Sequence, residues 1–162
     1  NQKAKECYEK AIEIDPNYVN GHNNLGVVFK DLGENQKAKD CFKKAIEIDP
    51  NDAKVYNNLG NVFVELKDYQ KAKDCYEKVI EINPNHANAL NNLGVIFTEL
   101  NDYQKAKDCF KKAIEIDPND VKVYNNLGNI YTELGENQKA KDCFKKVIEI
   151  DPNYTDAHNN LV

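Results

Sequence analysis

The chain has 162 residues, enough for one ordinary domain or for a short array of small repeated units. Charged residues make up 30% of it, and the formal net charge of -5 argues against a nucleic acid or an anionic membrane as partner. Every basic residue is a lysine, so the bidentate guanidinium group that often reads carboxylates and phosphates is missing. The sequence has no signal-like start and no apolar run near the ~20 residues that cross a membrane, which predicts a soluble protein.

The sequence repeats itself with a period of 34 residues. The segment KAKECYEKAIEIDPN begins at Lys3, and close variants of it begin at positions 37, 71, 105 and 139. We interpret the chain as one array with half a unit at 1–18 and the start of a further unit at 155–162. The four whole units between them are 19–52, 53–86, 87–120 and 121–154. LGVVF and LGVIF alternate with KVYNNLGN from unit to unit, so the true repeat is either one unit or a pair of 68 residues.

Taken in chain order, the array opens with a lone second helix, continues with four helix pairs and closes with half of a first helix. In the unit 53–86, apolar residues recur with helical spacing over 55–66 and again over 72–82. Pro84 ends the second helix, because proline disfavours helical backbone in the residue before it. Helices this short cannot bury their apolar faces alone, so successive pairs must stack into a continuous core.

The positions that build these helix pairs form a recognisable signature. In the repeat at 53–86 they are Tyr56, Leu59, Gly60, Phe63, Ala72, Tyr76 and Pro84. This pattern resembles the tetratricopeptide repeat, a helix-turn-helix unit of 34 residues, and the match spans the whole chain. The resemblance implies an all-α fold, an α-solenoid of antiparallel helix pairs wound into a right-handed superhelix. It also implies that the first helices line a concave groove in which a protein or peptide binds.

A polar stripe runs along the first helix of each unit. Residues three and four apart share a helix face, so Asn58, Asn61 and Glu65 lie together with Asn57 beside them. A carboxamide carries donors and an acceptor, and it can therefore bond a peptide backbone without reading its side chains. The alternative is a merely solvated polar face. The predicted partner-binding residues are Asn23, Asn24, Asn57, Asn58, Asn61, Asn91, Asn92, Asn125, Asn126, Asn129, Lys54, Lys122, Glu65, Glu99 and Glu133.

Two subtypes of the family are informative about this stripe. The row Asn24, Asn58, Asn92, Asn126 and Asn160 resembles the asparagine ladder in the repeat region of the O-linked N-acetylglucosamine transferases, which holds extended polypeptide. The catalytic domain of those enzymes has no counterpart here, so their activity is not carried over. Co-chaperone repeats carry a carboxylate clamp at the same positions of the first helices, but that clamp is built from lysines and an arginine together with asparagines. This chain has no arginine, so a clamp is not expected.

No catalytic site, metal site or cofactor is predicted, and we do not expect an enzyme. Nearly every polar residue recurs once per unit and is spread along the array, whereas catalysis needs groups that converge at one point. His22 and His158 occupy the place of Tyr56, and we interpret them as packing residues. His86 follows Asn85 in a turn between units and has no predicted partner. Repetition gives no reason for several metal ligands to meet.

The cysteines recur one period apart, at Cys7, Cys41, Cys75, Cys109 and Cys143. Equivalent places in stacked helices lie ~8 to 10 Å apart, whereas a disulfide needs Cα atoms within ~7 Å. We therefore predict reduced, half-buried packing thiols, which are typical of a reducing compartment and indicate the cytoplasm. The close cysteine pairs that bind zinc are absent from the sequence.

Two functions follow from this reading. The first is an interaction scaffold, in which the groove holds an extended segment of a partner through the asparagine ladder. The second is a structural protein whose near-identical units stack head to tail into oligomers or filaments, because neither terminal half-unit supplies the polar cap that solenoids usually need. The array either continues in a longer protein or stacks on copies of itself.

Overall fold

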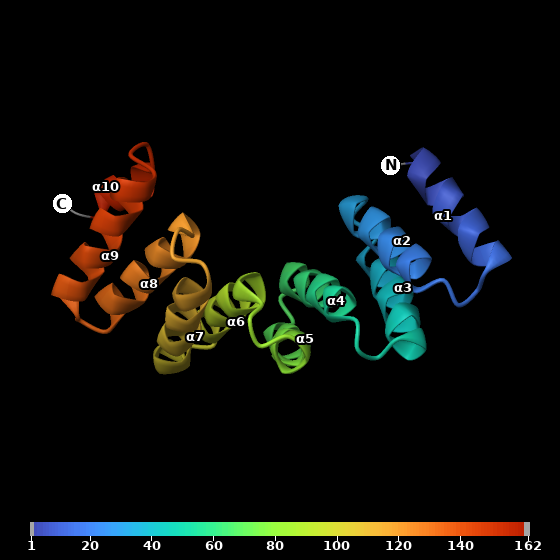
Figure 1. Ribbon diagram of the computed structural model, residues 1–162, viewed down its shortest axis with the longest axis horizontal. Coiled ribbons are helices and arrows are strands. Elements are labelled where there is room, and N and C mark those ends of the chain that lie inside the picture. Colours follow the sequence, from blue (N-terminus) through green and yellow to red (C-terminus); the bar gives the residue numbers. More distant parts are fainter. Residues whose placement is uncertain (1, 161–162) are drawn as a thin grey trace. The chain divides into compact units, whose positions relative to one another are not determined.

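The structure is a computed structural model that describes residues 2–160. Asn1, Leu161 and Val162 lie outside the described residues, so the half helix predicted at 155–162 is seen only to Asn160. The described residues form ten α-helices and no strand (Figure 1), which confirms the predicted all-α class. The helices are α1 (Gln2–Ile14), α2 (Val19–Asp31), α3 (Asn35–Ile48), α4 (Ala53–Glu65), α5 (Tyr69–Ile82), α6 (Ala87–Glu99), α7 (Tyr103–Ile116), α8 (Val121–Glu133), α9 (Asn137–Ile150) and α10 (Thr155–Asn159).

The helices fall into two compact units, Asn1–Pro84 with α1–α5 and Asn85–Val162 with α6–α10. In the first unit α2 packs on α3 and α4 on α5, while α3 also packs on α4. In the second unit α6 packs on α7 and α8 on α9, while α7 also packs on α8. Each unit is therefore a run of paired helices in which every helix packs on its neighbours in sequence, which is the packing of an α-solenoid.

A glycine facing an aromatic ring lets the two helices of each pair approach closely. A Cβ atom built on Gly26 of α2 would lie 2.7 Å from Cε1 of Phe42, and one on Gly128 of α8 would lie 2.6 Å from Cε1 of Phe144. Both rings are fully buried. Because real Cβ atoms do not approach a carbon so closely, only glycine fits under the ring. The other two pairs join Gly60 to Tyr76 and Gly94 to Phe110.

The turn within each pair passes through left-handed backbone. Gly33 and Gly135 take φ of 75° and 72°, as glycine does readily. Lys67 and Asn101 occupy the same place in the other two pairs with φ of 57° and 59°. In each turn the next residue donates its N–H back into the first helix, as Asp68 does to the Phe63 carbonyl at 2.9 Å. This pattern ends the first helix and reverses the chain.

The histidines have partners that the sequence did not suggest. The prediction that His86 has no partner is wrong, because its Nδ1 accepts a hydrogen bond from the Ala89 N–H at 3.1 Å and so caps α6. His22 is buried, as the packing interpretation predicts, whereas His158 is exposed, so that interpretation is wrong for His158. Nε2 of His22 also donates to the carbonyl of Pro16 at 2.8 Å. The rings of His22 and His86 therefore form hydrogen bonds at the starts of first helices, each within its own compact unit.

Candidate functional site

Asparagine side chains join neighbouring first helices within each compact unit. Nδ2 of Asn58 on α4 donates to Oδ1 of Asn23 on α2 at 2.9 Å. Nδ2 of Asn126 on α8 donates to Oδ1 of Asn91 on α6 at 3.0 Å. Each first helix of the four whole repeats carries two adjacent asparagines, such as Asn57 and Asn58, which we call the asparagine doublet. Both bonds link residues 35 positions apart, so the second asparagine of one doublet bonds to the first asparagine of the preceding doublet. These asparagines therefore have a structural role in joining first helices, in addition to the binding role that the sequence predicts.

The same bonds decide which amide groups are left for a partner. Asn58 and Asn126 each donate one N–H to the neighbouring helix, and each keeps a second N–H as a donor and its Oδ1 as an acceptor. In the first unit Asn23 also donates to Oδ1 of Asn24 at 3.3 Å, which leaves the Asn24 NH₂ group as a donor. The half-buried side chain of Asn92 makes no recorded hydrogen bond in the described part of the chain. A partner would meet a mixture of amide donors and acceptors.

The first asparagine of the doublet behaves differently in alternate repeats. Oδ1 of Asn23 and of Asn91 accepts the interhelix bonds described above. Oδ1 of Asn57 and of Asn125 is buried and has no hydrogen-bond partner among residues 2–160. Leaving such an acceptor unpaired costs about 1–3 kcal/mol. The 68-residue alternation in the sequence therefore has a counterpart in the hydrogen bonds.

Asn61 and Asn129 also have different partners. The Tyr76 hydroxyl donates to Oδ1 of Asn61 at 2.7 Å. Phe144 stands at the place of Tyr76 in the second unit and has no hydroxyl. Oδ1 of Asn129 instead accepts from Nδ2 of Asn160 at 3.3 Å, and the Asn129 NH₂ group stays available as a donor.

The charged residues of the predicted stripe lie at its two ends. Lys54 and Lys122 are exposed in the first turns of α4 and α8, and three carboxylates are exposed at the last residues of first helices. These acids are Glu65, Glu99 and Glu133. None of these five side chains forms an ion pair within the described residues, so all of them face solvent with their charge unneutralised.

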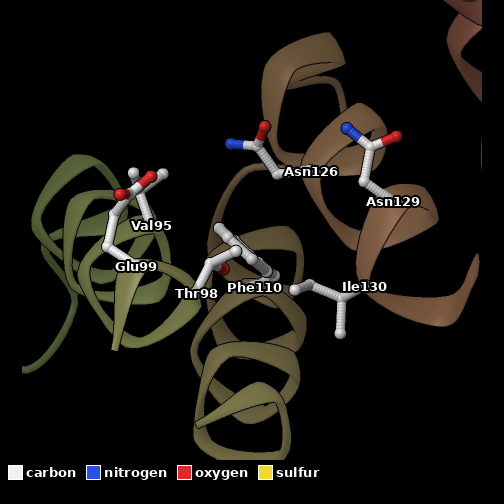
Figure 2. A pocket seen from close by; sticks show the side chains of 7 residues that line it. All are labelled: Val95, Thr98, Glu99, Phe110, Asn126, Asn129 and Ile130. Carbon is white, nitrogen blue, oxygen red and sulfur yellow. The ribbon is translucent and has the colours of Figure 1, made fainter. Parts of the chain in front are cut away.

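A cavity of about 200 Å³ opens beside the stripe in the second unit. It is lined by Val95, Thr98, Glu99, Phe110, Asn126, Asn129 and Ile130. Figure 2 shows Val95 and Glu99 on the α6 side of this cavity and Asn126, Asn129 and Ile130 on the α8 side, with the Phe110 ring between them. Helices α6 and α8 form its walls and α7 contributes its floor. Three predicted binding residues are thus brought together around one hollow.

The cysteines form no disulfide within the described residues, and they are not equally buried. Cys75, Cys109 and Cys143 are buried, Cys41 is half-buried and Cys7 is exposed. Burial disfavours the thiolate, and the nearby Asp74 carboxylate adds to this, so the pKa of Cys75 rises from 9.0 to about 12. Burial likewise raises the pKa of Cys41 and of Cys143 to about 11. These thiols are packing groups with little nucleophilic character at neutral pH.

Alkylation rates should follow this order. At pH 8 a pKa of about 12 in place of 9.0 lowers the thiolate fraction of Cys75 by about a thousandfold. We expect iodoacetamide to modify the exposed Cys7 first and Cys75 far more slowly, as read by peptide mass spectrometry. In guanidinium chloride all five cysteines should react alike. Equal rates for Cys7 and Cys75 in the folded protein would contradict the burial described here.

Neither a metal centre nor a spanning helix is found in the described part of the chain. Among residues 2–160, no three histidine, cysteine, aspartate or glutamate side chains gather closely enough to hold a metal ion. None of the helices from α1 to α10 combines the length and apolar character required to cross a bilayer.

The paired helices, the glycine under each ring and the 34-residue period define an α-solenoid of helix-turn-helix repeats. Family models for the tetratricopeptide repeat match residues 19–84, 51–119 and 121–154, and a further TPR repeat model matches residues 1–33. The chain belongs to the tetratricopeptide repeat family. Proteins of this family mediate protein–protein interactions.

Solved structures of the same family are similar over nearly the whole chain. A MamA structure is 28% identical with a TM-score of 0.86, covering 94% of this chain and 89% of MamA. YrrB, a TPR protein with an unusual peptide-binding site, is 27% identical with a TM-score of 0.86, covering 97% and 81% of the two chains. PilF of Pseudomonas aeruginosa is 25% identical with a TM-score of 0.88, covering 96% and 71%. No curated protein sequence matches the chain.

Proposed function

We propose that this chain is an interaction scaffold that holds an extended peptide segment of a partner protein against the asparagine-lined first helices of each compact unit. The observation that carries the proposal is the pair of interhelix bonds, Asn58 to Asn23 and Asn126 to Asn91. They fix the orientation of amides that still have bonding groups to offer. The peptide-binding site of the similar protein YrrB supports the same class of function.

The amides that face a partner suit a peptide backbone. An extended backbone presents N–H donors and C=O acceptors in alternation, and the stripe offers both kinds of group. In the first unit Asn58 presents an acceptor and Asn24 a donor. Because the interhelix bond already holds Asn58 in place, less side-chain freedom is lost when a peptide binds, and preorganisation of this kind favours affinity.

Alanine variants of the stripe test this function directly. Binders are selected from a random dodecapeptide library on the whole chain and then measured by fluorescence anisotropy. Asn92→Ala removes an amide without breaking any recorded internal bond, and we expect it to weaken binding by about tenfold, the value of one or two peptide hydrogen bonds. Asn58→Ala should weaken binding similarly and also lower stability by about 1 kcal/mol.

Asn51→Ala is the matched control, because Asn51 lies in the turn before α4 and away from the stripe. It should leave the affinity unchanged. Unaltered affinity in both Asn58→Ala and Asn92→Ala would show that the stripe is only a solvated face. Failure to select any peptide would overturn the proposed function itself.

The proposed role requires neither catalysis nor a cofactor, and we place it in the cytoplasm. The location is supported by the cysteines, none of which forms a disulfide within the described residues, as suits a reducing compartment. The selected peptides should therefore bind in buffers without metal ions or nucleotides.

Head-to-tail self-assembly is the second candidate function. It is favoured by α1, none of whose residues is buried, and by Ile14, which is 86% exposed at the end of that helix. Apolar surface of this kind can stack on a further repeat. Light scattering over a range of concentrations should then show a mass that rises with concentration. A constant monomer mass would remove this candidate.

A further inference from the structure

The cavity between α6 and α8 has an apolar body and a polar mouth. Val95, Phe110 and Ile130 supply the apolar lining, of which Phe110 and Ile130 are fully buried and Val95 is half-buried. Figure 2 places the carboxylate of Glu99 beside Val95, across the cavity from the amide of Asn126. A side chain that fits this hollow must therefore combine an aliphatic stem with a polar tip.

The polar groups around the mouth are mostly acceptors. One N–H of the Asn126 NH₂ group is donated to Asn91, and Oδ1 of Asn126 accepts no hydrogen bond within the described residues. The Thr98 hydroxyl donates its proton to the Gly94 carbonyl at 3.0 Å, which leaves only acceptor capacity on its oxygen. The Glu99 carboxylate accepts only, and it forms no ion pair within the described residues. Ammonium and guanidinium groups carry donors and no acceptor, so they complement this set.

At the corresponding positions of the first compact unit, the chain itself carries a cation next to the carboxylate. Sixty-eight residues earlier, Lys30 stands in place of Thr98 and Asp31 in place of Glu99, while the asparagines are unchanged. Nζ of Lys30 lies 3.6 Å from Oδ1 of Asp31. A lysine side chain is thus accommodated beside this carboxylate in one unit. In the second compact unit Thr98 and Glu99 stand at these places, and Glu99 forms no ion pair within the described residues.

We infer that the cavity between α6 and α8 receives a lysine or arginine side chain of the bound peptide, whose stem packs on Val95 and whose charged end meets the Glu99 carboxylate and Oδ1 of Asn126. The inference rests on the proposed peptide-binding function and adds a sequence preference to it. Asn129 completes the site: its Oδ1 is committed to Asn160 and its nitrogen lies on the side of Asn126 in Figure 2. That nitrogen is placed to donate to a backbone carbonyl of the same peptide.

The test uses the whole chain and the random dodecapeptide library already described. Peptides selected on the unaltered chain should be enriched in lysine and arginine. The strongest binder is then resynthesised with each basic residue replaced in turn by norleucine, which keeps the aliphatic stem and removes the charge. One of these replacements should weaken binding about tenfold, as expected for the loss of a charge-assisted hydrogen bond.

Three variants locate the effect. Glu99→Gln should weaken the basic peptide about tenfold and leave its norleucine form unaffected. Thr98→Lys introduces the residue that Lys30 represents in the first compact unit. It should also weaken the basic peptide about tenfold, because the chain's own lysine then pairs with Glu99. Glu115→Gln makes the same charge change on an exposed residue of α7 and should have no effect. Far-ultraviolet circular dichroism establishes that each variant is folded.

The outcomes distinguish failure of this inference from failure of the proposed peptide-binding function. If peptides bind but show no preference for basic residues, or if Glu99→Gln and Glu115→Gln bind alike, the inference is overturned and the scaffold function stands. If no peptide binds to the unaltered chain, the scaffold function fails and the inference falls with it.

Discussion

Replacing Phe42 with alanine is expected to lower the free energy of unfolding by about 3–5 kcal/mol. The Phe42 ring is 0% exposed and lies directly against Gly26, where its Cε1 atom would be 2.7 Å from an added Cβ. Removing the ring deletes apolar contacts and also leaves a cavity between α2 and α3 that the backbone cannot fully close. Urea unfolding followed by circular dichroism measures the change.

A variant on the same helix provides the comparison for Phe42→Ala. Lys43 is the next residue of α3 and is exposed, so Lys43→Ala should change the free energy of unfolding by no more than about 0.5 kcal/mol. A loss below about 1 kcal/mol for Phe42→Ala would mean that the ring is not the core contact described here.

Replacing Gly128 with valine is expected to cost about 1–3 kcal/mol of stability through overpacking. A Cβ atom at this position would lie 2.6 Å from Cε1 and 2.8 Å from Cζ of Phe144. The Phe144 ring is only 2% exposed and is enclosed by the core, so it cannot swing away. The helices α8 and α9 must therefore separate, and the same urea measurement reports the loss.

The double variant Gly128→Val with Phe144→Leu tests whether contact with the Phe144 ring causes the loss of stability. A smaller side chain at 144 gives the valine room, so the two changes should cost at least about 0.5 kcal/mol less together than the sum of each alone. Strictly additive costs would show that valine destabilises α8 for a reason other than contact with this ring.

The fold was largely predictable because its determinants are local and repeated. The helical spacing of apolar residues, the proline after each second helix and the leucine–glycine pair in each first helix of the four whole repeats are visible in one repeat, and their recurrence multiplies the signal. The partners of His22 and His86 were missed, since both are turn contacts that depend on the exact direction of a side chain. The burial differences among equivalent cysteines were missed too, because identical residues acquire different neighbours along the array.

The asparagine doublet shows where sequence reasoning ends. Its place on the first helix could be derived from helical spacing, but the bond between residues 35 apart depends on how two first helices lie against each other. No pattern within one unit contains that information. The difference between Lys30 and Thr98 was visible in the sequence from the start. Its meaning required the cavity of the second unit, which Thr98 lines.

The most direct test of the asparagine stripe as a binding surface is the nuclear magnetic resonance of the side-chain amides during titration with a selected dodecapeptide. We expect the NH₂ signals of stripe residues such as Asn58, Asn92 and Asn126 to shift as peptide is added. The turn residues Asn51 and Asn119 should not respond. Shifts confined to turn asparagines, or a stripe that stays unperturbed at saturation, would contradict the account.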